Sequence, residues 1–255
     1  NMAAALPLLG KMANAPETLP AMEVILIALF QENAADMLRW SYAVAEKPMP
    51  GVMATDAHRN VFRDPSPDGE RLDSFRRLMH WFSNYLLIPG DLEGDAIDDR
   101  VLKEAIAKGR LYSAFDYLGY PLGFDFHAES VVEDPGTGAE VDEPIIYEMG
   151  EQTPDANVTL VVATPTVWKA DPAGPQPLIK TRLLVAGEDG TWEMVAAVEG
   201  TGPGLRATLD TAGVYRVEVL ITPYHLTPWL GTEPEEYLRE LPWVYSNPIY
   251  VGMGW

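Results

Sequence analysis

The sequence contains no cysteine, which excludes disulfide bonds and metal sites built from thiolates. Histidine is scarce as well, with four residues, so a metal site would have to combine few imidazoles with carboxylates. Basic residues are also few, since 18 lysines and arginines face 38 acidic residues and the net charge is −20. Such a surface repels phosphate backbones and anionic lipids, so we expect neither a nucleic-acid nor a membrane partner.

Long apolar runs are missing too. The longest run, residues 21–30, is interrupted by Glu23 and falls short of the ~20 residues that cross a bilayer. The apolar start precedes Ala13-Asn14-Ala15, a small-residue cleavage pattern, but no basic residue precedes that start. Neither a signal peptide nor a transmembrane segment is therefore clearly visible, and the composition leaves the compartment open.

The first half of the chain has the composition of alternating helices and short strands. Helix-forming and periodically apolar residues predict helices over 19–47, 71–88 and 98–108. Short apolar runs predict buried strands over 52–55 and 111–115. This order is typical of an α/β layout with parallel strands.

The second half changes character, because strand-like segments alternate with turns rich in Gly and Pro. Strands are predicted over 158–162, 181–186, 192–198, 206–209 and 215–221. Tyr215 follows Asp-Thr-Ala-Gly-Val, the pattern of a tyrosine corner, in which the hydroxyl bonds to the backbone upstream. We therefore predict an α/β domain over 1–130 and an Ig-like antiparallel β-sandwich over 131–255.

Asp56 and His58 are the candidate metal ligands. They follow the predicted strand at 52–55, and side chains two residues apart on a strand share one face. Functional groups of α/β folds gather at such strand ends. A carboxylate and an imidazole suit zinc, manganese or iron. The neighbouring Arg59 is a weaker catalytic candidate, positioned to contact an anionic oxygen of a substrate.

This pair is incomplete as a metal centre, because a catalytic zinc usually takes three protein ligands. The remaining histidines, His80, His127 and His225, occur in no recognised metal-binding spacing. A packed or capping role is expected for His80, an exposed position for His127 and a loop for His225. Spacing alone thus leaves open whether Asp56 and His58 bind a metal.

Three segments carry a family resemblance. GVMATDAHRN, at 51–60, resembles the last metal-binding motif of PHP (polymerase and histidinol phosphatase) domains. KEAIAKGRLYSAFDYLG, at 103–119, and PWVYSNPIYV, at 242–251, are similar to segments of the carbaryl-hydrolase-like branch, which has an appended β-sandwich. The resemblance implies part of a distorted βα barrel that holds a metal cluster, with Asp56 and His58 as ligands.

The same resemblance implies metal-assisted hydrolysis of a small-molecule phosphoester, amide or carbamate. A metal would lower the pKa of a bound water and polarise the substrate. However, the His-x-His motif that the family carries earlier in its domain does not occur before residue 51. We therefore expect the chain to represent the C-terminal half of such an enzyme, inactive alone because most metal ligands are missing.

Two alternatives remain open at this stage. In the first, the chain is a non-catalytic binding module whose sandwich recognises a ligand or protein. Trp168, Trp192, Trp229 and Trp243 would then supply an aromatic platform. In the second, a partner chain, or the missing N-terminal half of the same protein, supplies the remaining metal ligands.

Overall fold

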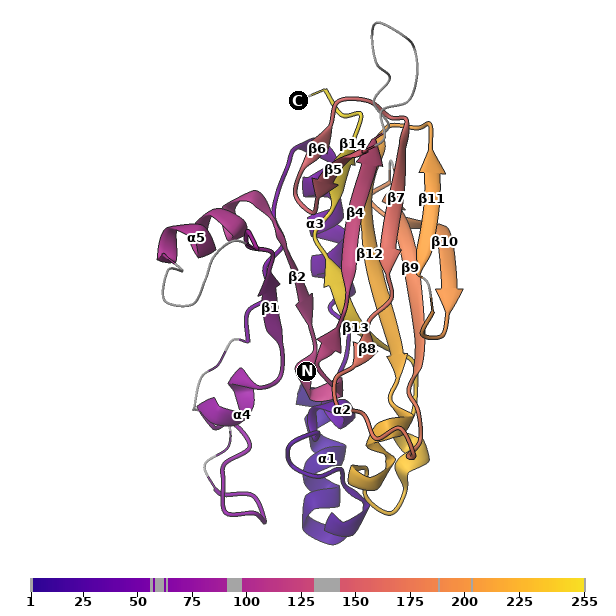
Figure 1. Ribbon diagram of the computed structural model, residues 1–255. Helices are drawn as coiled ribbons and strands as arrows, with labels where there is room; N and C mark the ends of the chain where they lie inside the picture. Colours follow the sequence, from indigo (N-terminus) through magenta and orange to yellow (C-terminus); the bar gives the residue numbers. More distant parts are fainter. Residues whose placement is uncertain are drawn as a thin grey trace, which may run out of the picture.

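The computed structural model describes residues 2–55, 57, 62, 64–90, 98–130, 143–187, 189–202 and 204–254, with residues 2–6 described by their backbone alone. The chain combines short helices with mostly antiparallel sheets (Figure 1). Within the described residues the sheets do not close into a barrel.

The larger sheet is built around strand β12. One edge of β12 pairs with β9, which pairs in turn with β10. The other edge pairs with β13 along its C-terminal half and with β14 along its N-terminal half. Beyond β13 lie β2 and then β1, and β6 runs parallel to β14. The strands are β1 (Ser83–Leu86), β2 (Leu111–Ala114), β6 (Gln152–Thr153), β9 (Leu178–Ala186), β10 (Trp192–Glu199), β12 (Gly213–Thr222), β13 (Leu241–Ser246) and β14 (Ile249–Val251).

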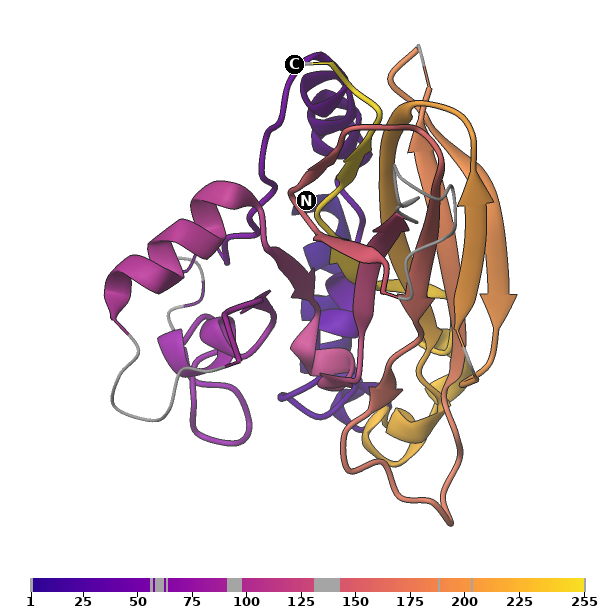
Figure 2. The same ribbon diagram turned by 45° about the horizontal axis from the view of Figure 1, so that its top comes forward.

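A second, four-stranded sheet lies against the first, and the two form layers in both views (Figures 1 and 2). Its order is β11-β7-β4-β5, from strands β4 (Asp125–Ser130), β5 (Ile145–Glu148), β7 (Val158–Ala163) and β11 (Leu205–Leu209). Alternate residues of β7 are buried, as expected for a strand with one face in the core. Phe126 and Leu160 from this sheet share one apolar cluster with Val217 and Trp243 from the larger sheet. A small pair, β3 (Pro121–Leu122) with β8 (Thr166–Val167), lies beside them.

Helices precede and connect the strands of the first half. They are α1 (Met2–Asn14), α2 (Leu26–Leu29), α3 (Ala34–Glu46), α4 (Phe75–Met79) and α5 (Asp99–Lys108). The predicted helix over 98–108 is confirmed as α5. Its first turn is capped by the side chain of Asp98, and it ends at Gly109, which has φ 72° in the left-handed region.

Several predictions for the first half are wrong. The predicted helix over 71–88 contains only α4 and then becomes β1, whose residues pair with β2. Residues 19–47 form two helices rather than one, because the backbone is extended at Phe30. The strands β1 and β2 are antiparallel rather than parallel, and residues 52–55 form no strand. Tertiary pairing thus overrides the helical spacing of apolar residues.

The strand predictions for the second half are confirmed. All five predicted strands are present, as β7, β9, β10, β11 and β12. The hydroxyl of Tyr215 donates to the carbonyl oxygen of Thr211 at 3.0 Å, which confirms the predicted tyrosine corner. The division into two domains near residue 130 stays a prediction. None of the helices in the described part of the chain is long and apolar enough to span a membrane.

Candidate functional site

The three segments that carry the family resemblance meet at residues 51–53. The backbone N–H of Gly51 donates to Oδ1 of Asn247 at 2.6 Å, and Nδ2 of Asn247 donates back to the Gly51 carbonyl at 2.9 Å. The same Nδ2 donates to the carbonyl of Leu111 at 3.1 Å. One buried amide therefore joins residues from all three segments.

Asn247 is available because the C-terminal strand is interrupted between β13 and β14. Pro248 has no N–H to continue a ladder. The N–H of Val217 on β12 bonds instead to the hydroxyl of Ser246, at 2.7 Å. The backbone N–H of Asn247 donates to the carbonyl oxygen of Leu111 at 3.2 Å, and the Asn247 side chain is buried. Because of the Ser-Asn-Pro sequence, Asn247 leaves the strand ladder, and its side chain bonds to the neighbouring segments instead.

A second amide repeats this arrangement two residues further along. Oδ1 of Asn84, on β1, accepts from the Met53 N–H at 3.1 Å, and its Nδ2 donates to the Met53 carbonyl at 2.9 Å. Ser113, opposite Asn84 on β2, donates to the same Oδ1 at 2.6 Å. In a sheet, the backbone groups of Gly51 and Met53 would bond to the backbone of a neighbouring strand. Here side-chain amides bond to them instead. This explains why the predicted strand at 52–55 is absent. We call Asn84 and Asn247 the amide clamps.

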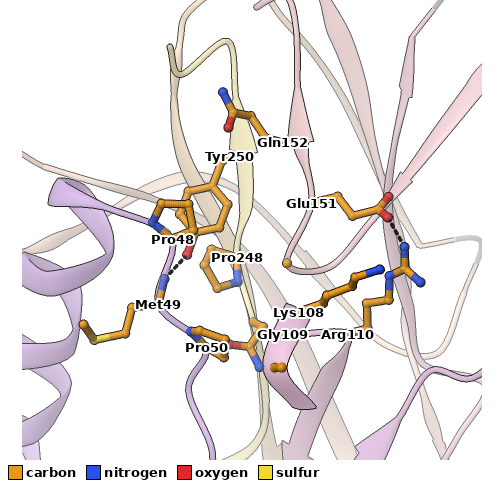
Figure 3. Close-up of a pocket in the computed structure, with 13 residues that line it drawn as sticks. Pro48, Met49, Pro50, Lys108, Gly109, Arg110, Glu151, Gln152, Pro248 and Tyr250 are labelled. Carbon is orange, nitrogen blue, oxygen red and sulfur yellow. Dashed lines mark hydrogen bonds and ion pairs between the residues drawn. The ribbon is translucent and has the colours of Figure 1, made fainter. Parts of the chain in front are cut away.

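The segment before Gly51 is fixed by close contacts. A Cβ on Gly51 would lie 2.8 Å from the Trp40 ring, so only glycine fits beneath that ring. The indole of Trp40 donates to the Met49 carbonyl at 3.3 Å, and the Met49 N–H donates to the Tyr250 hydroxyl at 3.0 Å. Figure 3 shows Pro48 beside the Tyr250 ring, in a pocket of about 330 Å³.

The two cations that line this pocket are each paired with an acid. Arg110 forms an ion pair with Glu151, drawn as a dashed line in Figure 3. Lys108 pairs with Glu104 one helical turn earlier. The pocket therefore offers no unpaired positive charge to an anionic ligand, and we interpret it as the junction between α5, residues 48–50 and β14.

A larger cavity, of about 530 Å³, lies on the other side of the clamped segment. Its walls come from residues 50–54, from α3 and from the larger sheet, including Trp40, Ser113 and Tyr245, and from Phe82, which directly precedes β1. An adjoining hollow of about 340 Å³ shares Met53 and Tyr245 and is lined by Glu32. The Tyr245 hydroxyl donates to Glu32, and burial raises the pKa of Tyr245 far above its usual range. Tyr245 is therefore a neutral donor at physiological pH.

Arg216 is a buried cation close to this cavity wall. Its guanidinium carbon lies 4.5 Å from the ring centre of Trp192, and 5.5 and 5.7 Å from those of Tyr245 and Trp40. Burial lowers the pKa of Arg216, and the nearby Glu218 carboxylate opposes this effect. The three rings replace water around the cation, so Arg216 anchors α3 to the outer face of β12.

Sequence reasoning missed the buried acid Asp116. Asp116 accepts hydrogen bonds from the hydroxyls of Ser83 and Tyr85, the latter at 2.8 Å. Burial raises the pKa of Asp116, and the two hydroxyl bonds partly offset that effect. Its position directly after the predicted strand 111–115 was the available signal.

The predicted metal ligands Asp56 and His58, and the catalytic candidate Arg59, lie outside the described residues. Two of the described histidines, His127 and His225, form hydrogen bonds with other parts of the fold. His127 is mostly buried, rather than exposed as expected, with Nδ1 2.6 Å from Asp125 and Nε2 3.5 Å from Glu129. Across the described ranges, no group of three or more histidines and acids is arranged to hold a metal. The described residues therefore form no such metal centre by themselves.

The four tryptophans of the expected platform do not act together. Trp243 is fully buried and its indole donates to the Gly119 carbonyl at 2.7 Å, while Trp192 packs on Arg216. Trp168 and Trp229 are exposed by 47% and 53% and line a common pocket. Two of the four thus stay about half-exposed beside one pocket.

Comparisons with protein-family models, curated proteins and solved structures gave no match to this chain.

Proposed function

We propose that this chain is the C-terminal part of a PHP-type metal-dependent hydrolase that acts on a phosphoester, amide or carbamate. In this proposal Asp56 and His58 are metal ligands and Arg59 contacts the substrate. The remaining ligands come from a preceding segment of the same protein or from a partner chain. The α/β part would correspond to a portion of a βα barrel, and the second half to an Ig-like sandwich.

One observation carries the proposal: the three segments that resemble the family are hydrogen-bonded to one another through Asn247. Motif matches that arose by chance would have no reason to meet around one buried amide. The clamped residues also lie directly before the proposed ligands in the sequence, so the clamps restrain the chain that leads to them.

The strand order supports the sandwich part of the proposal. The chain passes from β7 in one sheet to β9 and β10 in the other, returns to β11, and crosses again to β12. This alternation between sheets, together with a tyrosine corner before the last strands, is typical of Ig-like domains.

Zinc and manganese titrations followed by calorimetry would test the metal assignment. We expect one weak, saturable site in the chain, lost in Asp56→Asn and in His58→Ala and retained in His80→Ala, the matched control. Equal metal binding by all variants would contradict the assignment. We also expect no turnover of a phosphodiester such as bis(p-nitrophenyl) phosphate by this chain alone, because two ligands are too few for a catalytic site. Turnover that His58→Ala abolishes would overturn that expectation.

A further inference from the structure

The pocket that Trp168 and Trp229 line is surrounded by exposed aromatic side chains. Its volume is about 380 Å³, within the range of small-molecule sites. Trp168, Trp229 and Tyr120 line it, and each is between 42% and 53% exposed. Lys169, Asp171 and His225 add polar groups to its wall. We call these six residues the aromatic pocket.

The walls of the aromatic pocket are held in place by hydrogen bonds. The N–H of Trp168 donates to the Tyr120 carbonyl at 2.9 Å, next to the paired strands β3 and β8. Nε2 of His225, on the 3-10 helix η4 (Tyr224–Trp229), lies 3.0 Å from the Leu118 carbonyl. The loop after β8 and the segment containing η4 lie at the same end of the molecule in Figures 1 and 2. The site is therefore preformed.

The backbone of this loop also has an unusual conformation. Lys169 has φ 56°, and it is the one residue other than glycine that has positive φ in the described ranges. That conformation is sparsely populated by residues with a Cβ and is found disproportionately at binding and catalytic sites. It places the Lys169 ammonium 4.1 Å from the ring centre of Trp168.

The charges of the aromatic pocket restrict the ligand class. Anions are disfavoured by the net charge of −20 and by the carboxylates of Asp171 and Asp116 in the wall. A cationic ligand would be repelled by the Lys169 ammonium, which lies over a face of Trp168. The fitting ligand is neutral, with apolar faces for the rings and hydrogen-bonding edges for the lysine and the acids.

We propose that the aromatic pocket binds a neutral saccharide of one or two rings. The C–H groups on the face of a sugar ring carry slight positive charge and match the negative face of an indole. Its hydroxyls can accept from Lys169 and donate to Asp171. This binding is independent of the proposed metal chemistry.

Saturation-transfer NMR on the 255-residue chain would test the proposal, with maltose, cellobiose, lactose and N,N′-diacetylchitobiose as separate probes. We expect at least one disaccharide to bind. Its affinity should fall at least tenfold in Trp168→Ala and in Trp229→Ala, and persist in Trp229→Phe. The matched control is Tyr224→Ala, since Tyr224 is 42% exposed on the same 3-10 helix but does not line the pocket.

Thermal unfolding of each variant would confirm that the substituted chains remain folded, as expected for half-exposed side chains. The proposal is overturned if none of the four disaccharides binds, or if binding persists unchanged in both Trp→Ala variants. Stronger binding of choline chloride, tested in parallel, would identify a cation site instead and would equally overturn it.

Discussion

Replacing Asn247 by alanine tests whether the amide clamp holds segment 51–53. The substitution removes three hydrogen bonds, two to the backbone of Gly51 and one to the carbonyl of Leu111. The Leu111 carbonyl keeps its bond from the backbone N–H at position 247, whereas Gly51 loses both of its partners. A buried polar group left without a partner costs about 1–3 kcal/mol, and Gly51 is only half-buried. We therefore expect a loss of about 2–4 kcal/mol in the free energy of unfolding.

Urea denaturation followed by circular dichroism would measure this loss. The matched control is Asn14→Ala, because Asn14 is exposed and makes one hydrogen bond, to the Gly10 carbonyl. That control should cost at most about 0.5 kcal/mol. If Asn247→Ala were no more destabilising than Asn14→Ala, the amide clamp would contribute nothing and the reasoning would be refuted.

The substitution Asn247→Asp keeps the shape of the side chain but removes its amide donors, so it tests the donors alone. A carboxylate keeps the acceptor for the Gly51 N–H but directs an oxygen at two carbonyl oxygens. Burial and those carbonyls would raise the pKa of the introduced carboxyl above its unfolded value of about 3.9. The folded state then binds the proton more tightly, so the variant is least impaired below about pH 4 and loses stability as pH rises through the raised pKa. A destabilisation that does not change between pH 4 and 7 would contradict this assignment.

Three further substitutions test the fold by the same unfolding measurement. Gly150→Ala should lower the free energy of unfolding by more than about 3 kcal/mol, because the new Cβ would lie 1.8 Å from a backbone carbonyl oxygen at the end of α5. The control Gly69→Ala, at the same φ of 83° but in open space, should lower it by about 1 kcal/mol. Equal losses in the two variants would refute the close contact. Tyr215→Phe should cost about 1 kcal/mol through loss of the corner bond, and no change would mean that the bond adds nothing. Burial lowers the pKa of His225, so the unfolded chain takes up the proton first and the free energy of unfolding should fall as pH drops below about 6.5. His225→Gln should make the free energy of unfolding less dependent on pH in this range. An unchanged pH dependence would exclude His225 as its source.

The second half of the chain was predictable because its strands are short runs rich in β-branched and apolar residues, separated by turns that contain Gly and Pro. In β7, buried and half-buried residues alternate along the whole strand, and its run of mostly β-branched apolar residues favours a strand in the sequence. The tyrosine corner was predictable for a similar reason, since it depends on a local spacing. Helix α5 was predictable because its end signals, an acid cap and a terminal glycine, are local too.

The first half was less predictable because non-local pairing decides its structure. Residues 71–88 have apolar residues at helical spacing, yet Ser83 to Leu86 pair residue by residue with β2. A periodicity argument sees only the segment itself and cannot weigh a partner strand that follows more than twenty residues later. The buried acid Asp116 escaped notice for the same reason, because its hydroxyl partners lie on β1.

The failed strand prediction at 52–55 is the most informative error, since the physical reasoning behind it was partly correct. An extended, partly buried backbone must find hydrogen-bond partners, and a strand ladder is the usual solution. Here two asparagines supply the partners, and each satisfies the N–H and the carbonyl of one residue. A ladder bonds a whole run of residues, and its register is set by the buried face and by the turns rather than by single residues. Two amide clamps bond Gly51 and Met53 individually, so they fix the register of this segment at single residues, directly before the proposed metal ligands in the sequence.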